Sequence, residues 1–301
     1  MLITETIDEF LMYLEVERNY AENTIRAYAY DLMLFEGFLR NSRRSMMEIE
    51  EIRPVNIRRF VQEQVREAGA SPRTMQRRIS CLKALSRFCV RERFIDQDFT
   101  VGIEVPKIEQ NLPVYMTLEE LQKLFRFLES DTRPLALRNE LIFKLLATTG
   151  MRRQELVDLN WDQLNLDNQT IRIKGKGKKE RLLPLHPIVL PLFQTYMETL
   201  DEYQKHSSQP VFLSKNKKVM NPRGLHVLFK NILEKAGLPP TRFSLHHLRH
   251  TFATLLLQEN KENVDLRLLQ ELLGHENLSS TQVYTHIDFE QKRKAIGTFK
   301  I

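Results

Sequence analysis

The sequence predicts a mainly α-helical protein of two domains, with one small antiparallel β-sheet in the second domain. Its 301 residues suggest two domains, because a domain usually has roughly 100–200 residues. Apolar residues recur at helical spacing through most of the chain. Only Gln169–Lys174 and Arg181–Leu185 alternate like strands, and the Gly/Lys-rich segment between them favours a hairpin turn.

The first domain, residues 1–100, is expected to be helical. Thr4–Leu14 and Asn23–Leu39 both place apolar residues on one side of a helix. Pro54 opens a third helix in its first turn. A fourth, Pro72–Arg91, follows Ser71, a candidate N-cap.

A linker is expected over residues 101–115, where prolines interrupt the helical pattern. A second domain with a C-terminal tail then covers residues 116–301. Thr117 and Glu120 match a capping box that opens its first helix. The further helices expected are Leu135–Ala147, Arg152–Asn160, Pro187–Leu200, Pro222–Ala236, Ser244–Gln258, Asp265–Leu273 and a short one capped by Ser279 or Ser280, before a basic tail, Gln291–Ile301.

Composition excludes several classes of protein. Hydrophobic residues make up 42% and charged residues 28%, which is ordinary for a globular protein. No apolar run approaches the ~18 residues of a membrane span, and the acidic start of the chain does not match a secretory signal. Cys81 and Cys89 lie eight residues apart in a helical pattern, roughly 12 Å, which is too far for a disulfide. We therefore expect a cytoplasmic protein with no membrane partner.

The expected fourth helix carries a basic face. Residues 53–93 contain 11 Lys/Arg and three Asp/Glu, although the whole chain has a net charge of only +6. A solvated face usually mixes both signs, whereas arginine forks suit phosphate oxygens. The arginines of this face lie in one narrow sector, opposite apolar residues that include Val90, and we interpret them as DNA-binding: Arg73, Arg77, Arg87 and Arg91.

Four segments of the second domain place polar residues at helix ends or turns. Arg152 begins a helix, where its charge opposes the helix dipole. Lys174–Lys179 is a glycine-rich turn that fails the spacing of a Walker-type phosphate loop. The third segment contains His246, Arg249 and His250, and the fourth contains His275 and Tyr284.

A metal site is one alternative for the histidines. His246 and His250 have the i,i+4 spacing of metal ligands. However, Arg249 lies between them, and a fixed cation beside a dication is unfavourable. We expect no metal site and no cofactor.

Together these polar residues suit one reaction. A tyrosine supplies an oxygen nucleophile. Two arginines bind nonbridging phosphate oxygens and stabilise the charge that grows in the transition state. A lysine or histidine donates a proton to the leaving oxygen.

The four segments also resemble a known family in their order and separation. T-G-M-R-R-Q-E-L at 149–156, G-K-G at 175–177, H-H-L-R-H at 246–250 and L-L-G-H at 272–275 are similar to the motifs of the tyrosine recombinases, or phage-integrase family. The resemblance covers nearly the whole chain and implies that residues 1–100 form a helical DNA-binding domain, the core-binding domain, and residues 116–301 the catalytic domain. The length of the chain is similar to that of the compact Xer-type recombinases and of resolvases or integrases of mobile elements.

The resemblance implies a role for each site residue. Arg152 and Arg249 bind the phosphate, Lys176 is the general acid, His246 and His275 complete the site, and Tyr284 is the nucleophile. Glu155 and His250 have supporting roles. The enzyme would join itself to a 3′ phosphate in double-stranded DNA at a specific core site, then exchange strands through a four-way junction, without ATP or a required metal.

The resemblance further implies a homo- or hetero-tetramer on DNA, with the tail from Asp288 to Ile301 docked on a neighbouring protomer. Packing of this tail on its own domain is the alternative. Two other functions stay open: a type IB topoisomerase, and a DNA-binding regulator that makes no covalent bond.

Overall fold

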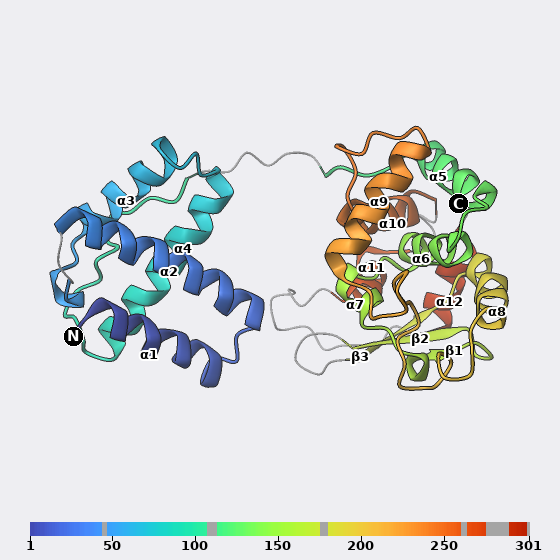
Figure 1. Cartoon of the computed structure of the whole chain (residues 1–301), viewed down its shortest axis with the longest axis horizontal. Coiled ribbons are helices and arrows are strands. Elements are labelled where there is room, and N and C mark those ends of the chain that lie inside the picture. Colours follow the sequence, from blue (N-terminus) through green and yellow to red (C-terminus); the bar gives the residue numbers. More distant parts are fainter. Residues whose placement is uncertain (44–46, 107–112, 175–179, 260–263, 275–288, 300–301) are drawn as a thin grey trace. The chain divides into compact units, whose positions relative to one another are not determined.

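The computed structural model describes residues 1–43, 47–106, 113–174, 180–259, 264–274 and 289–299. The chain divides into two compact units, Met1–Asn111 and Leu112–Ile301 (Figure 1). Each unit has its own hydrophobic core. The prediction of a mainly helical protein with a small antiparallel sheet is confirmed. No helix in the described part of the chain has both the length and the apolar character to cross a membrane.

Unit 1 is built from helices that bury their apolar sides against one another. Its core includes Phe10, Phe35, Phe60 and Leu82. Ser71 caps the fourth helix as expected, since its hydroxyl accepts a hydrogen bond from the Thr74 amide at 3.2 Å. The helical elements are α1 (Ile3–Val16), α2 (Glu22–Arg43), the 3-10 turn η1 (Ile49–Glu51), α3 (Pro54–Arg66) and α4 (Pro72–Arg91).

Two details of unit 1 differ from the sequence prediction. Val90, expected on the buried side of α4, is 38% exposed. Ile103, which lies in the expected linker, is buried in the unit 1 core together with Phe99 of the expected first domain. Packing against unit 1 therefore continues beyond the end of α4.

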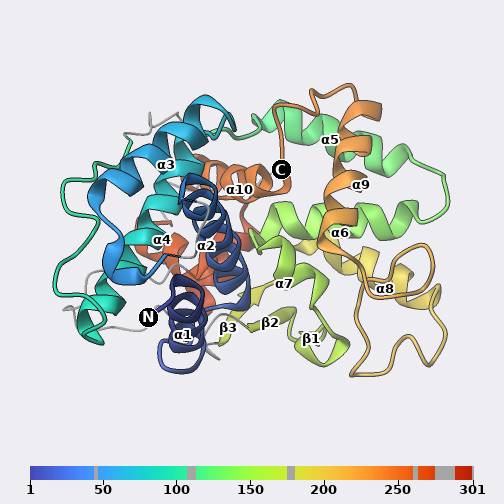
Figure 2. The same cartoon turned by 60° about the vertical axis from the view of Figure 1, so that its left-hand side comes forward.

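Unit 2 is arranged around one buried helix, α6 (Ala136–Thr149), which contacts helices on several sides. In both views α6 lies between the sheet and the side of the unit that holds α5 and α9 (Figures 1 and 2). The capping box of Thr117 and Glu120 is present at the start of α5. The other helices are α5 (Leu118–Ser130), α7 (Arg153–Val157), α8 (Leu190–Glu198), α9 (Pro222–Lys235), α10 (Leu245–Glu259), α11 (Leu266–Leu273) and α12 (Phe289–Gly297).

The sheet has three antiparallel strands in the order β1-β2-β3, one more than the hairpin that the sequence predicts. The hairpin strands are β2 (Thr170–Lys174) and β3 (Glu180–Pro184), in a register that pairs Ile171 with Leu183. The additional strand, β1 (Leu164–Asn165), has two residues. A two-residue strand is too short to show an alternating pattern, so it gave no signal in the sequence.

Two helices are shorter than expected. The segment predicted as Arg152–Asn160 is helical only as α7, and the chain then turns into the 3-10 segment η2 (Trp161–Gln163). The segment predicted from Pro187 begins with the 3-10 turn η4 (Pro187–Val189) before α8. Pro191 has no N–H to bond to the carbonyl four residues earlier, which favours the break between η4 and α8. The short helix expected at Ser279 or Ser280 lies outside the described residues.

The described part of the C-terminal tail packs on its own unit. Ala295, Ile296 and Phe299 are buried in the unit 2 core. The Phe299 ring lies edge-on to Phe252, with centroids 5.9 Å apart, and its carbonyl is 2.8 Å from Nε2 of His186. In this single chain, the tail thus follows the alternative of packing on its own domain.

Candidate active site

The site begins at a sharp turn where α6 ends. Gly150 has a left-handed conformation, with φ of +61°, and a Cβ there would collide with the ring of Phe252 and approach Leu273 to 2.9 Å. Glycine alone meets both the backbone and the space requirement. The turn therefore brings the end of α6, α10 and α11 together and places Arg152 directly after it.

Arg152 is the N-cap of α7 and is held by Glu155. Its backbone N–H donates to Glu155 Oε2 at 2.7 Å, and its Nη1 donates to Glu155 Oε1 at 2.9 Å. The carboxylate offsets the unfavourable position of an arginine at a helix N-terminus. The Arg152 side chain is still 47% exposed, so its guanidinium can reach a ligand.

Glu155 also accepts two hydrogen bonds from Arg181 of β3, at 2.9 and 2.7 Å. Burial alone would raise the pKa of this carboxyl. The bonds and charge of Arg181, together with the bonds from Arg152, outweigh burial and lower the Glu155 pKa to about 2. Glu155 is therefore a fixed anion between two arginines.

Arg249, on α10, is buried and is 6% exposed. Its Nη1 donates to the Gly150 carbonyl and its Nη2 to the Leu273 carbonyl, both at 2.7 Å. Burial, and then the charge of Arg152, lower the pKa of Arg249 to about 10. Since two of the five N–H groups of a guanidinium make these bonds, the side chain is fixed and still has donors for a ligand.

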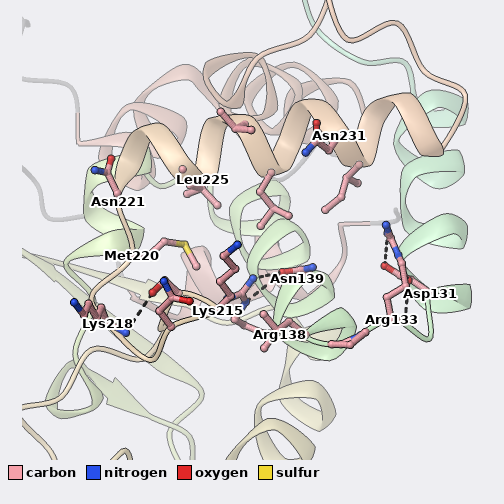
Figure 3. Close-up of a pocket in the computed structure, with 18 of the residues that line it drawn as sticks. Asp131, Arg133, Arg138, Asn139, Lys215, Lys218, Met220, Asn221, Leu225 and Asn231 are labelled. Carbon is pink, nitrogen blue, oxygen red and sulfur yellow. Dashed lines mark hydrogen bonds and ion pairs between the residues drawn. The ribbon is translucent and has the colours of Figure 1, made fainter.

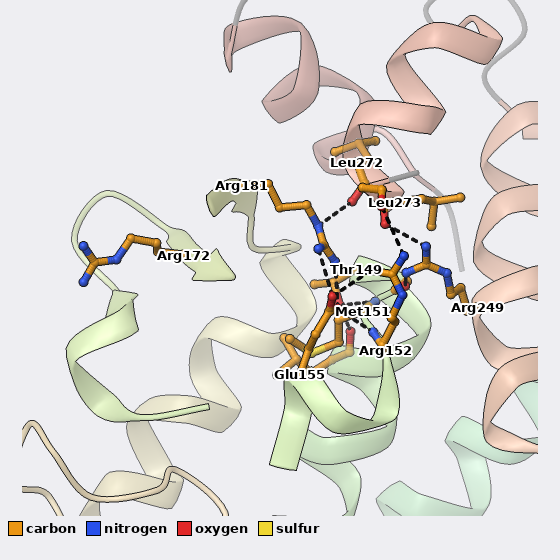
Figure 4. A network of polar contacts seen from close by, with 12 residues as sticks. Thr149, Met151, Arg152, Glu155, Arg172, Arg181, Arg249, Leu272 and Leu273 are labelled. Carbon is orange, nitrogen blue, oxygen red and sulfur yellow. Dashed lines mark hydrogen bonds and ion pairs between the residues drawn. The ribbon is translucent and has the colours of Figure 1, made fainter. Parts of the chain in front are cut away.

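Three arginines meet the C-terminal end of α11 (Figure 4). The Leu272, Leu273 and Gly274 carbonyls accept from Arg181, Arg249 and Arg152, respectively. The last carbonyls of a helix have no partner within the helix and carry its partial negative charge. The end of α11 thus fixes three cations at one place.

The histidines of α10 lie beside these arginines. The His246 and His250 rings meet edge to face, with centroids 4.6 Å apart. Burial lowers the pKa of His246, and so do the charges of His250, Arg249 and Arg152. Burial likewise lowers the pKa of His250. In the described chain no third His, Cys, Asp or Glu joins them in a metal-type group.

The structure thus brings together the arginines, Glu155 and the α10 histidines that the sequence indicates. Lys176, His275 and Tyr284 lie outside the described residues. Arg181 was missed, although a signal existed. Arg181 and Leu183 share one face of β3, because side chains alternate along a strand, and Leu183 is buried. A charged residue on a buried face requires a buried partner.

The arginines of α4 differ in their surroundings. Arg73 and Arg87 are exposed. Arg77 is ion-paired with the buried Asp31 and donates to the Ala27 carbonyl at 3.1 Å. Arg91 stacks on the Tyr13 ring, 4.0 Å from its centroid, and pairs with Glu92. Arg73 and Arg87 are therefore the better placed of the four to meet DNA.

A separate hollow of about 680 Å³ lies between α9 and the start of α6 (Figure 3). Its wall includes Arg138, which donates to Asn139 Oδ1 and to the Leu213 carbonyl. Arg138 precedes Gly150 by 12 residues, about 18 Å along a helix. The hollow is thus distinct from the arginine site.

Two arginines fixed on backbone carbonyls form a site of the kind that binds phosphate groups. Residues 114–291 match the Phage integrase family, and residues 7–93 match the phage integrase N-terminal SAM-like domain. The chain belongs to the phage integrase family and is a tyrosine site-specific recombinase.

Relatives support this membership over nearly the full length. Tyrosine recombinase XerC of Oceanobacillus iheyensis is 34% identical over 96% of this chain and 93% of its own. Tyrosine recombinase XerD of Staphylococcus epidermidis is 33% identical over 97% of both chains. The XerH site-specific recombinase, solved bound to its difH substrate, is 26% identical over 96% of this chain and 83% of its own, with a TM-score of 0.67. The topoisomerase alternative receives no support from these matches.

Proposed function

We propose that this recombinase cuts and rejoins double-stranded DNA at a specific core site through a 3′-phosphotyrosyl intermediate and a four-way junction. The observation that carries the proposal is the fixing of Arg152 and Arg249 on adjacent carbonyls of one helix end. Fixed donors stabilise growing charge without reorganising during the reaction. The difH complex of XerH supports DNA as the partner.

The proposed chemistry divides the roles among the site residues. The Tyr284 hydroxyl loses its proton to solvent as its oxygen attacks the phosphorus, and the bond to the 5′ oxygen breaks. Arg152 and Arg249 hold the nonbridging oxygens, and Lys176 gives its proton to the 5′ oxygen as it leaves. His246, whose lowered pKa favours the neutral ring, completes the site with His275. Glu155 and His250 support Arg152 and His246.

The experiment that tests this function is covalent trapping. A core site is first recovered by selecting bound duplexes from a random pool. A nick beside the cleavage position lets a short strand diffuse away, so the covalent intermediate accumulates. We expect a protein–DNA adduct that survives denaturing gels and forms in EDTA. Binding without any adduct would support the regulator alternative, and relaxation of plasmids without a core site would support a topoisomerase.

Replacement of Lys176 by alanine tests the general acid. We expect slow cleavage of ordinary DNA and recovered cleavage of a duplex with sulfur at the 5′ bridging position, because a thiolate leaves without protonation. Single-turnover rates on the two substrates measure this recovery. Equal defects on both would mean that another group donates the proton.

Unit 1 is proposed to carry DNA affinity through the exposed arginines of α4. Arg73→Ala should flatten the dependence of log K on log salt by about one unit, since each phosphate contact contributes ~0.9. Arg77→Ala should lower the free energy of unfolding, because the buried Asp31 would lose Arg77 and keep only Arg78 as an arginine partner. Anisotropy titrations at several salt concentrations and urea unfolding separate the two effects. An unchanged slope in Arg73→Ala would mean that Arg73 contacts no phosphate and is only part of a solvated face.

The tail is proposed to contribute to a tetramer on DNA by docking on a neighbouring protomer. The family resemblance supports this proposal, and the buried Phe299 sets a condition on it. Either the buried apolar residues of the tail leave their own unit to reach the neighbouring protomer, or the outer face of α12 makes the contact with that protomer. The composition of the tetramer, homomeric or heteromeric, depends on that contact.

Deletion of Phe299–Ile301 should lower stability by about 3 kcal/mol, the scale of removing one buried phenylalanine. The measurement is urea unfolding beside gel-shift stoichiometry, with Phe299→Leu as a milder control that keeps an apolar side chain. We also expect the folded deletion variant to lose cooperative binding, which would show that the tail acts between protomers. Unchanged values in both assays would remove the tail from assembly.

A cytoplasmic location is also proposed. Its support is the nature of the substrate together with two buried free cysteines in unit 1, Cys81 and Cys89. Burial raises the pKa of Cys89 to about 12, so its thiol stays protonated and unreactive.

A further inference from the structure

Arg181 is fully engaged inside the protein. Its side chain is 12% exposed, and each of its nitrogen atoms has a described acceptor. Nη1 and Nη2 bind the two oxygens of Glu155, and Nε binds the Leu272 carbonyl at 3.1 Å. Such a fork fixes orientation as well as charge. Arg181 therefore acts on the site through the groups it holds.

Those groups are the anchors of both phosphate-binding arginines. Glu155 holds the backbone and the guanidinium of Arg152. Leu272 directly precedes the carbonyls that hold Arg249 and Arg152. Gly274 packs on Arg181 so closely that a Cβ there would lie 2.9 Å from Arg181 Nη1. A single side chain thus connects β3, the start of α7 and the end of α11 (Figure 4).

We propose that Arg181 is a positioning residue of the recombinase, which sets the geometry of Arg152 and Arg249 by holding Glu155 and the end of α11. This inference rests on the proposed function, in which the two arginines bind the scissile phosphate. Loss of the fork would leave Glu155 buried beside Arg152 alone and would free the Leu272 carbonyl. A displacement of about 1 Å in such a site can cost ~10²-fold in rate.

Arg172 offers a matched control. It lies on the neighbouring strand β2 and is 45% exposed, with Asp162 at 3.9 Å. Figure 4 shows its side chain pointing away from the arginine network. Arg172→Gln removes one positive charge from the same sheet, as Arg181→Gln does, but leaves the contacts of the arginine site unchanged.

The test compares single-turnover cleavage of the nicked core-site duplex in Arg181→Gln, Arg181→Lys, Arg172→Gln and Arg152→Ala, with DNA affinity and melting temperature measured for each. We expect Arg181→Gln to bind DNA like wild type and to cleave ~10- to 100-fold more slowly. Arg181→Lys should recover part of the loss, and Arg172→Gln should behave like wild type.

A double mutant separates positioning from a general structural role. If Arg181 acts through Arg152, the loss in the Arg152→Ala/Arg181→Gln protein should be clearly smaller than the product of the two single losses. A double-mutant loss equal to the product of the two single losses, or wild-type cleavage by Arg181→Gln, would overturn the inference. If Arg181→Gln does not fold, a folded Arg181→Lys protein decides: slower cleavage supports the inference, and wild-type cleavage overturns it. Unchanged cleavage in Arg152→Ala would instead remove the proposed function, and the inference with it.

Discussion

Tyr284→Phe is expected to abolish DNA cleavage while leaving DNA binding nearly intact. The substitution removes only the oxygen that would attack the phosphorus, and no described residue of the arginine site offers another oxygen nucleophile of this kind. Cleavage should fall below detection in the suicide-substrate assay. Gel shifts on the same duplex should keep the affinity of the wild-type protein.

The control for this variant is the wild-type protein in the same assay. Wild-type protein and Tyr284→Phe are compared at equal occupancy of the duplex, so that a loss of adduct reports chemistry alone. Residual covalent complex in the variant would show that the nucleophile is another residue.

Arg249→Ala is expected to slow cleavage by about 10²–10³, the usual effect of removing one donor that stabilises charge in a transition state. Because Arg249 is buried and bonds to Gly150 and Leu273, the variant also leaves two buried carbonyls without this partner. Unfolding by urea should therefore show lower stability. The cleavage rate is measured at saturating protein, where the folded and bound fraction is known.

Arg152→Ala provides the comparison. Its side chain is far more exposed than that of Arg249, so the same loss of rate should come with a smaller loss of stability. If DNA affinity and cleavage fall by equal factors in both variants, the arginines contribute to general binding and not to the transition state.

The helices of unit 1 and most of those of unit 2 were predictable, because the spacing of apolar residues and the capping residues can be read within one short segment of sequence. Ser71 and Thr117 cap helices where the sequence indicates, and Gly274 ends α11 in the left-handed conformation. β1 was not predictable from a sequence pattern, because only its pairing with β2 identifies it as a strand.

The site was predictable in part. In the sequence, Arg152 stood out as a cation at a helix start and Arg249 as a cation in a histidine-rich helix. The two lie far apart in the chain, and in the structure they bind adjacent backbone carbonyls at the end of α11. The pairings of Glu155 with Arg181 and of Asp31 with Arg77 depend on contacts between distant segments. No spacing rule within one helix or strand reveals such partners.

In the proposed reaction, this recombinase forms a covalent bond to DNA through Tyr284 at a site prepared by Arg152 and Arg249. The most direct measurement is to trap the adduct on a nicked core-site duplex, digest it with protease and identify the DNA-linked residue by mass spectrometry. We expect one nucleotide-modified peptide, with the modification on Tyr284. Modification of another residue, or a protein that binds the duplex and forms no adduct, would contradict it.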